Sequence, residues 1–196
     1  MTGRPEELEH VLPKWIYEIA TDPFCWRSNK KIRRRNAGMF REMRRKNQAL
    51  SGEECVRVLT EERRGVLSVL GDDGYPYGMP LNHWYDPAEG RLYFHGGKVG
   101  QRVDAVKKHD KVSYCVYDKG TPREGDWALY VRSVVIFGRL HPVEDRELAM
   151  DVCRRLCYKF TADEEYISNE ILQHGEKTLV CELIPEHMTG KLVKES

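Results

Sequence analysis

The sequence has no apolar run long enough to cross a bilayer, because its runs, such as residues 134–137 (VVIF), are short and about 18 residues are needed. Its first ten residues, MTGRPEELEH, lack the basic and then apolar pattern of an export signal. It also lacks a surplus of either charge, since 32 Lys and Arg accompany 31 Asp and Glu. These absences predict a soluble, cytoplasmic protein with no membrane partner, and they argue against a polycation that binds nucleic acid.

Cysteine is present but lacks the spacing of a disulfide framework or a zinc site. The six cysteines are scattered, with no CxxC pair, and a chain of 196 residues can bury a core without crosslinks. Cys153 and Cys157 are four residues apart on one face of a predicted helix, which is half of a metal site. They also fall on the apolar stripe of that helix, where a free cysteine packs as a small hydrophobic residue. We therefore expect reduced, mostly buried thiols and no metal.

Positive charge is concentrated near the amino terminus, where nine of the seventeen residues 30–46 are Lys or Arg. Such a run can bind phosphate backbones, but no helix-turn-helix or zinc-finger pattern accompanies it. We favour a solvated helix face that pairs with acidic residues of the chain or of a partner subunit. The sequence predicts a helical extension over residues 1–38 and one main domain over residues 39–196.

Capping, turn and alternation signals predict the secondary structure of the main domain. Capping boxes at residues 51–54 (SGEE) and 161–164 (TADE) each predict a helix start, and Gly175 fits the end of the second helix. Asp73-Gly74 between two β-rich runs predicts a hairpin. Further helices are expected near residues 99–109 and 145–160, and strands over residues 66–70, 75–86, 91–95, 111–118, 127–140 and 178–185. This order gives an α+β fold with a mostly antiparallel, closed or nearly closed sheet.

The segment YFHGGKVGQR, residues 93–102, carries the clearest signal for chemistry. A predicted strand ends, two glycines without Cβ atoms follow, and Lys98 stands at the entrance of a helix. Free amides at a helix start, close approach through glycine and a lysine charge together favour a phosphate site. The segment is neither a Walker motif nor a dinucleotide fingerprint. A glycine-rich turn with a solvated lysine is the alternative.

The hairpin before this turn also suits a ligand. Pro76, Gly78 and Pro80 interrupt the extended run YPYGMPLN, residues 75–82. Because proline donates no hydrogen bond to a sheet, this run is predicted to lie at an edge, a bulge or a corner. Such a position leaves backbone amides and carbonyls free to meet a flat heterocycle.

Four segments in this order carry a resemblance to a known family: MRRKNQALSGEEC, GVLSVLGDDGYPYGMPLNHWYD, LYFHGGKVGQRVDAVKKHDKVSYCVYD and RSVVIFGRLHPVED. Over residues 39–191 the chain resembles the pyridoxamine 5′-phosphate oxidase-like superfamily of flavin-binding split barrels, and within it most of all the nitroimidazole-resistance branch. The resemblance implies a mostly antiparallel, six-stranded split β-barrel with flanking helices. It also implies a homodimer that holds FMN at the subunit interface.

The resemblance assigns the flavin site to three segments. It implies that the strand at residues 78–82 lines the isoalloxazine, that the turn at residues 95–98 with Gln101 holds the ribityl phosphate, and that the strand at residues 132–135 comes from the partner chain. The cofactor-binding residues so implied are Met79, Pro80, Leu81, Asn82, His95, Gly96, Gly97, Lys98, Gln101 and Ser133. Members that oxidise pyridoxamine phosphate have a more basic phosphate-binding strand and an Arg-rich carboxyl terminus, and the lack of both here argues against that activity.

His95 is the catalytic residue that the resemblance implies. A histidine in the matching context lies beside the flavin, where it can donate a proton to a reduced substrate, since histidine titrates near neutral pH. A histidine that only hydrogen-bonds the phosphate or the turn is the alternative. His83, on the strand before it, is interpreted as an exposed sheet histidine, with a haem ligand in a divergent member as the alternative.

The predicted function is that of an FMN-dependent oxidoreductase that passes electrons from flavin N5 to a small electrophile, such as a nitroimidazole or a quinone. Two alternatives stay open. One is a split barrel that binds haem or a deazaflavin, and the other is a flavin-binding protein without turnover. No pyridine-nucleotide fold is present, so the sequence does not identify the electron donor.

Overall fold

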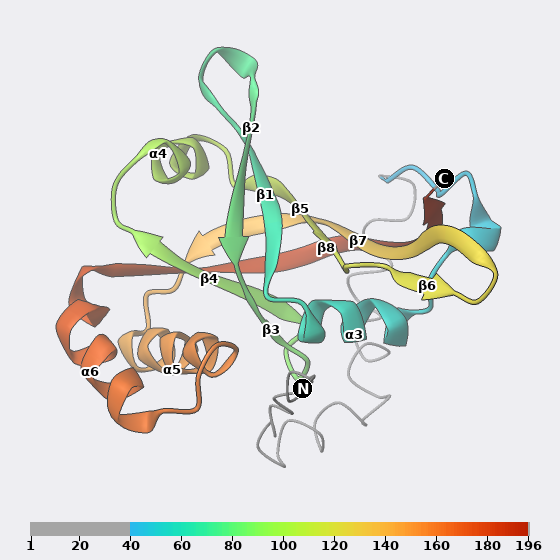
Figure 1. Cartoon of the computed structure of the whole chain (residues 1–196). Coiled ribbons are helices and arrows are strands. Elements are labelled where there is room, and N and C mark those ends of the chain that lie inside the picture. Colours follow the sequence, from blue (N-terminus) through green and yellow to red (C-terminus); the bar gives the residue numbers. More distant parts are fainter. Residues whose placement is uncertain (1–39, 196) are drawn as a thin grey trace, which may run out of the picture.

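A computed structural model describes residues 40–195 (Figure 1), and the predicted extension, residues 1–38, lies outside them. The described part forms one eight-stranded antiparallel sheet with four α-helices, so the predicted α+β class is confirmed. Six strands have at least seven residues, and two further strands, β3 and β6, have three each. The strands are β1 (Arg64–Leu70), β2 (Pro76–Asn82), β3 (Trp84–Asp86), β4 (Arg91–Gly97), β5 (Lys111–Tyr117), β6 (Thr121–Arg123), β7 (Asp126–Pro142) and β8 (Thr178–Glu195). The helices are α3 (Gly52–Glu61), α4 (Gln101–Lys108), α5 (Arg146–Tyr158) and α6 (Glu164–His174), with 3₁₀ turns η1 (Lys46–Gln48), η2 (Asp72–Gly74) and η3 (Gly175–Lys177).

The long central strands β7 and β8 curl the sheet, whose order is β2-β1-β5-β7-β8-β4-β3 with β6 paired to β7. Their register shifts between Phe137 and Gly138, which leaves one extra residue, Glu186, on β8. A bulge of this kind bends a strand pair and increases its twist. Glycine is needed at position 138, because a Cβ there would lie 2.3 Å from the carbonyl oxygen of Ile184. The bend lets the first part of β8 pair with β4 while the rest continues beside β7.

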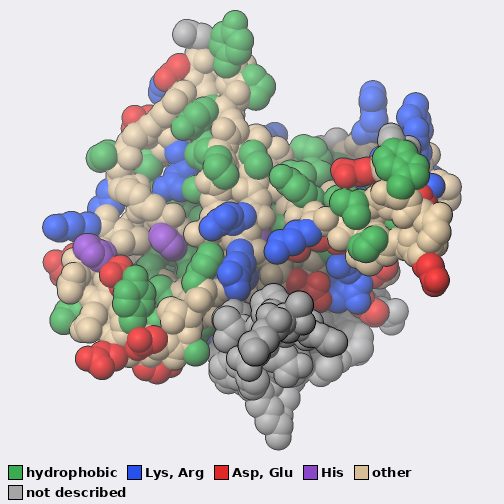
Figure 2. Space-filling model, viewed as in Figure 1, with side chains coloured by type: hydrophobic (Ala, Val, Ile, Leu, Met, Phe, Trp, Pro, Cys, Tyr) green, Lys and Arg blue, Asp and Glu red, His purple; other side chains and the backbone are tan. Residues whose placement is uncertain are grey.

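Helices α5 and α6 form a pair inserted between β7 and β8, and the exposed side of this pair carries acidic side chains (Figure 2). The inner side of α5 buries Val152, Cys153 and Leu156 against Tyr93 and Val180 of the sheet. Burial raises the pKa of the Cys153 thiol to about 11, as expected of a packed cysteine. Within residues 40–195, no three His, Cys, Asp or Glu side chains are placed to hold a metal ion. No helix in that range is long and apolar enough to cross a membrane.

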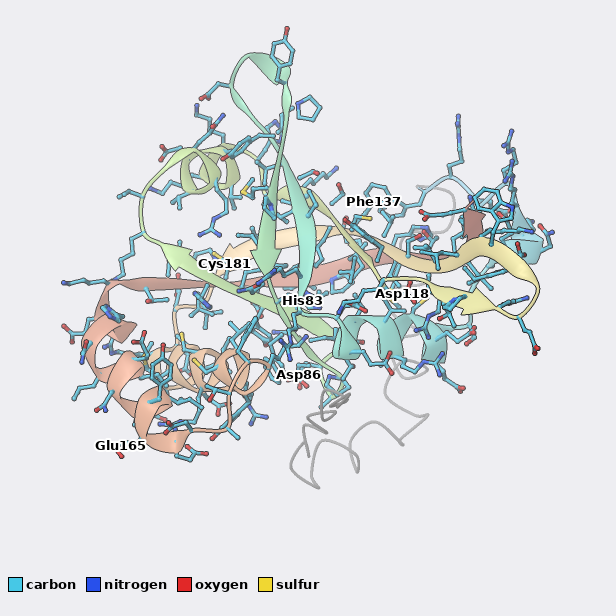
Figure 3. All side chains as sticks on the ribbon, in the orientation of Figure 1. His83, Asp86, Asp118, Phe137, Glu165 and Cys181 are labelled. Carbon is cyan, nitrogen blue, oxygen red and sulfur yellow. The ribbon has the colours of Figure 1, made fainter. Side chains whose placement is uncertain are left out.

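The main core lies inside the curled sheet and is closed at one end by α3. Its largest fully buried side chains include Phe94 and Tyr114, and Cys181 of β8 also belongs to it (Figure 3). Helix α3 adds Val58 and Leu59, both essentially inaccessible to solvent. Burial of apolar area on this scale is the main force that holds the barrel together.

Of the two predicted capping boxes, the first is present in the structure and the second is not. The box at the start of α3 is confirmed: the Ser51 hydroxyl accepts the Glu54 amide at 3.1 Å, and the Glu54 carboxylate accepts the Ser51 amide at 2.7 Å. The box predicted at Thr161 is wrong, because Asp163 is the N-cap of α6 and accepts the Tyr166 amide. The Thr161 hydroxyl instead accepts the amide of Asp163 itself, an alternative that side chains of this type offer to nearby backbone groups.

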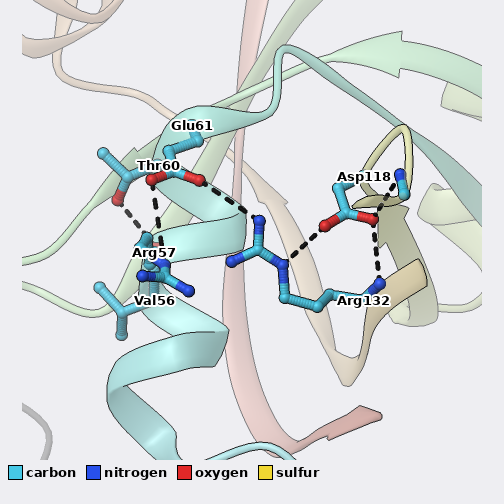
Figure 4. Close-up of polar contacts among 7 residues, drawn as sticks. Val56, Arg57, Thr60, Glu61, Asp118 and Arg132 are labelled. Carbon is cyan, nitrogen blue, oxygen red and sulfur yellow. Dashed lines mark hydrogen bonds and ion pairs between the residues drawn. The ribbon is translucent and has the colours of Figure 1, made fainter. Parts of the chain in front are cut away.

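Asp118 follows β5, and its carboxylate joins the loop after that strand to β7 and, through Arg132, to α3 (Figure 4). Its buried carboxylate accepts Arg132 Nε at 2.6 Å, the Arg132 amide at 2.9 Å and the Gly120 amide at 3.0 Å. The Arg132 guanidinium also lies 3.9 Å from the Glu61 carboxylate of α3. Burial alone would raise the pKa of Asp118, but the hydrogen bonds and charge of Arg132 outweigh it and lower that pKa. The carboxylate is therefore a structural anion that holds three elements together.

Candidate functional site

A hollow of about 400 Å³ opens where the start of β1 and the end of β2 face β4. We call it the β2–β4 hollow, and it is lined by Arg64, Pro80, Leu81, Asn82 and His95. Four of these five residues were predicted from the sequence as cofactor-binding. Arg64 was not, because nothing in the sequence places the start of β1 beside them.

Strand β2 lies at the edge of the sheet, as its prolines predicted. Within the described residues it pairs with β1 and leaves its other edge without a strand. The side chains of Met79 and Leu81 are turned towards the core, whereas Gly78 and Pro80 are exposed. The His83 amide donates to the Arg63 carbonyl, so the alternating ladder turns the backbone groups of Met79 and Leu81 towards β1 and leaves those of Gly78, Pro80 and Asn82 at the free edge. The free edge of β2 is suited to hydrogen-bonding the rim of a flat heterocycle.

His83 is buried, so the expectation of an exposed sheet histidine is wrong (Figure 3). Its Nε2 lies 2.8 Å from the Leu59 carbonyl oxygen, and its Nδ1 lies 2.9 Å from the Tyr114 hydroxyl. A carbonyl only accepts, so Nε2 carries the proton and Nδ1 is the acceptor. Burial, helped by the Lys159 charge, lowers the pKa of His83 to about 3. Since both ring nitrogens are engaged inside the core, His83 is not available as a haem ligand.

The glycine turn, residues 96–100, joins β4 to α4 and leaves backbone amides open. Gly100 precedes α4 with φ +120°, a conformation that side chains rarely adopt, and no described side chain caps the helix. The first amides of α4 therefore have no intrahelical acceptor. Free amides and the positive end of a helix dipole make this turn suited to an anion, as predicted.

Arg102 completes the glycine turn and was not among the residues predicted from the sequence. A Cβ on Gly96 would lie 2.4 Å from Arg102 Nη2, so the glycine is what allows the guanidinium to lie against the backbone of the turn. No hydrogen bond or ion pair joins Arg102 to another described residue. The first turn of α4 also carries the Asp104 carboxylate, which suits the positive end of the helix dipole. The available signal was an Arg directly after the glycine-rich entrance of a helix.

His95 lines the β2–β4 hollow and is close enough to Arg102 for the guanidinium charge to act on it. It ends the buried part of β4, and its side chain is open to solvent. The surrounding protein, and then the charge of Arg102, lower the pKa of His95 below its usual value. His95 is therefore a neutral imidazole at pH 7 while no anion is bound at Arg102.

Lys98 and Gln101 lie at the turn but face different neighbours. Lys98 Nζ donates to the Glu176 carbonyl oxygen at 2.5 Å, which ties the turn to η3. The amide of the Gln101 side chain lies near Gly71, since a Cβ on that glycine would be 3.7 Å from Gln101 Nε2. Gly71 directly follows β1, so Gln101 marks the end of β1 opposite to Arg64.

Ser133 lies apart from the other predicted residues. It belongs to a second hollow of about 260 Å³, the β7–β8 hollow, lined by Arg41, Met43, Ser133, Val135, Phe137, His187, Thr189 and Lys191. Phe40 stacks on His187 beside it, with ring centroids 4.7 Å apart. Within one chain the two hollows are separate, so Ser133 cannot share a ligand with His95 unless a second copy brings it there.

The sheet face that carries Ser133 holds a group of exposed hydrophobic side chains together with polar ones, such as Arg64 and Ser68 of β1. Val66, Cys115 and Val135 form one cross-strand row on it, from β1 through β5 to β7. The exposed hydrophobic side chains that these three strands place on this face are Val66, Leu70, Tyr117, Trp127, Leu129 and Phe137. Exposed apolar patches of this extent are typical of association surfaces.

The chain was compared with known proteins. The family model described as pyridoxamine 5′-phosphate oxidase matches residues 51–192. A putative 5-nitroimidazole antibiotic resistance protein from Bacteroides thetaiotaomicron is similar at 16% identity and a TM-score of 0.62, over 74% of this chain and 87% of that one. An FAD-binding protein from Mesorhizobium loti is similar at 23% identity and a TM-score of 0.55, over 74% and 97%. The flavocytochrome Anf3 from Azotobacter vinelandii is similar at 16% identity and a TM-score of 0.59, over 81% and 77%. No curated protein sequence matches. The structural likenesses confirm the predicted split-barrel fold.

Proposed function

Because the chain belongs to the pyridoxamine 5′-phosphate oxidase family, we propose that it is an FMN-dependent oxidoreductase with the flavin held between the edge of β2 and the glycine turn. Its substrate is a small electrophile such as a nitroimidazole or a quinone. Two structural relatives named as flavin proteins and one named for nitroimidazole resistance support this class of cofactor and substrate.

The observation that carries the proposal is the contact between Gly96 and Arg102. This contact holds a guanidinium against the backbone of Gly96, and the uncapped amides of α4 begin five residues later, so the turn offers both a charge and free amides to the terminal phosphate of FMN. The outward backbone groups of Gly78, Pro80 and Asn82, at the free edge of β2, are available to hydrogen-bond the rim of the isoalloxazine. When bound, the flavin supplies the redox chemistry, and the protein supplies binding, orientation and exclusion of water.

A second copy of the chain completes this site in our proposal. The sheet face of β1, β5 and β7 that carries Ser133 supports a homodimer, because six exposed hydrophobic side chains lie on it. Ser133 lies in the middle of that face, between Tyr117 and Lys191 on the neighbouring strands. In a dimer formed through this face, Ser133 of the partner subunit would contribute to the flavin site, as the resemblance implies.

His95 is the proton donor of the proposed reaction. Without a bound anion its imidazole is neutral, because the surrounding protein and then the charge of Arg102 lower its pKa. A phosphate held by Arg102 would offset the guanidinium charge and raise the pKa of His95 towards neutrality. The ring would then carry a proton that it can pass to the reduced substrate in the β2–β4 hollow, which it lines.

Anaerobic reduction of the flavin-loaded protein by NADH, NADPH or dithionite, followed by addition of a nitroimidazole or a quinone, tests the proposal. We expect turnover, and a loss of about 100-fold in His95→Gln at equal flavin content, the effect of removing a general acid. His109→Gln, at an exposed position after α4, is the matched control and retains full turnover. Flavin-loaded protein that turns over no acceptor would leave only the binding-protein alternative.

A further inference from the structure

Arg64 lines the β2–β4 hollow together with His95, and most of its hydrogen-bonding capacity is unused. Its Nε donates to Asn82 Oδ1 at 3.1 Å, and its side chain is exposed. A guanidinium has five N–H groups, and the other four have no hydrogen bond or ion pair with a described residue. Because its planar fork matches a carboxylate, an unpaired guanidinium at the mouth of a hollow is suited to binding that group in a bidentate manner.

The bond from Arg64 also fixes Asn82. With Oδ1 accepting from Arg64, the amide nitrogen of Asn82 is left with two N–H groups that no described residue accepts. Asn82 therefore offers donors alongside the guanidinium. Both residues line the hollow, so the two sets of donors are available to one ligand.

The charge of the hollow is positive. Its lining consists of one guanidinium, one amide, one imidazole and two apolar residues, without a carboxylate. Glu62, two residues before Arg64, interacts electrostatically with Asp118, Glu61, Lys119 and Lys159. Figure 2 shows Lys and Arg side chains gathered at the lower end of the β1–β2 hairpin, with a histidine beside them towards β4.

Arg64 and Gln101 lie at opposite ends of β1. Arg64 begins the strand, whereas Gln101 lies next to Gly71, directly after it. At about 3.3 Å per residue, the strand separates these two residues by about 20 Å, so a group bound at Gln101 is out of reach of Arg64. Arg64 instead shares the hollow with His95, the residue before Gly96 of the turn.

We propose that Arg64, hydrogen-bonded to Asn82, is a specificity-determining residue that selects substrates bearing a carboxylate on a small aromatic or heteroaromatic ring. A hollow of about 400 Å³ has room for one substituted ring. Binding of the carboxylate at Arg64 places the rest of the ring beside His95. The assignment of this ligand as an electron acceptor rests on the proposed function, whereas its recognition by Arg64 does not.

Isothermal titration of the protein as purified with 4-nitrobenzoate and with its neutral analogue 4-nitrobenzamide tests the proposal. We expect the benzoate to bind about 10- to 100-fold more tightly than the amide, the range for charge-assisted hydrogen bonds. Arg64→Gln should abolish this preference and Arg64→Lys should keep part of it. Equal affinity for the two compounds, or an unchanged preference in Arg64→Gln, would overturn the proposal.

Arg63→Gln is the matched control, because the Arg63 guanidinium stacks on Phe160 and does not line the hollow. It removes the same charge one residue away and should keep the preference in full.

Arg64→Gln should also leave the affinity for FMN unchanged, and a tenfold loss would place Arg64 in the phosphate cradle and overturn the assignment. In turnover, Arg64→Gln should raise KM for the benzoate alone, with kcat unchanged. The protein could prefer the benzoate to the amide through Arg64 and yet show no reductase activity. That result would support the anion site and refute the proposed function.

Discussion

Replacing Arg102 with Gln is expected to weaken FMN binding about 30-fold, within the range for loss of a charge-assisted hydrogen bond to a phosphate. The Arg102 guanidinium lies against Gly96, where the absence of a Cβ leaves room for it. The lost affinity should come only from the contact with the phosphate group, because the variant leaves the contacts with the flavin ring unchanged. Titration of flavin-free protein with FMN, followed by quenching of flavin fluorescence, measures this change.

Two controls isolate the phosphate contribution. Riboflavin carries the same ring without the phosphate, so its affinity should be equal in the wild type and in Arg102→Gln. Lys107→Gln removes a charge from an exposed position of the same helix and should have little effect. Lys98→Gln should lose less affinity than Arg102→Gln, because the Lys98 ammonium is bonded to the Glu176 carbonyl. An Arg102 variant that binds FMN as tightly as the wild type would remove Arg102 from the cradle.

The buried His83 should make the protein less stable in mild acid. Its pKa is about 3 when folded, against 6.5 as the ordinary value. Below pH 6.5 the unfolded chain takes up a proton that the folded chain refuses, so unfolding becomes easier as pH falls towards 3. At about 1.4 kcal/mol per pH unit, His83 lowers the free energy of unfolding by about 3 kcal/mol between pH 6.5 and pH 4. Urea denaturation across this range measures the slope.

His83→Gln should flatten this dependence by about one proton, even though the variant is less stable at pH 7 through lost contacts to Leu59 and Tyr114. His174→Gln removes an exposed imidazole and should keep the wild-type slope. The lowered pKa of Asp118 acts in a different window, below its ordinary value of 3.8, where protonation removes stability that is present above it. Parallel curves for the wild type and His83→Gln would contradict the assignment of the acid sensitivity to His83.

The elements that local chemistry specifies were predictable. The box at Ser51 and the turn at Asp73-Gly74 depend on residues close in the sequence, and both lie where expected. The strand predicted over residues 178–185 continues in the structure to Glu195 as β8, through Pro185 and Gly190. Pro185 is tolerated because it lies at the bulge opposite Gly138, and Gly190 allows the Cys55 sulfur to approach, with a Cβ there only 2.3 Å from Sγ.

What the sequence could not show is contact through space. His83 continues the alternation of Met79 and Leu81, whose side chains are turned towards the core, but the sequence did not show that this face is the buried one. In the sequence, Arg102 is one of several cations in a charged helix, and only the structure shows that its guanidinium lies next to Gly96. Arg64 and His95 are 31 residues apart and meet only because β1, β2 and β4 converge on one hollow. The predicted residues Pro80, Leu81, Asn82 and His95 do meet there, whereas Ser133 lies in the β7–β8 hollow.

The measurement that tests the central claim most directly is the ultraviolet–visible spectrum of the purified protein, repeated after denaturation, with chromatography of any released chromophore. The account predicts a two-band flavin spectrum and the release of FMN rather than FAD, at one per chain. It also predicts uptake of added FMN by protein purified without colour. A Soret band would contradict the account in favour of haem. A colourless protein that does not bind added FMN would refute the flavin site altogether.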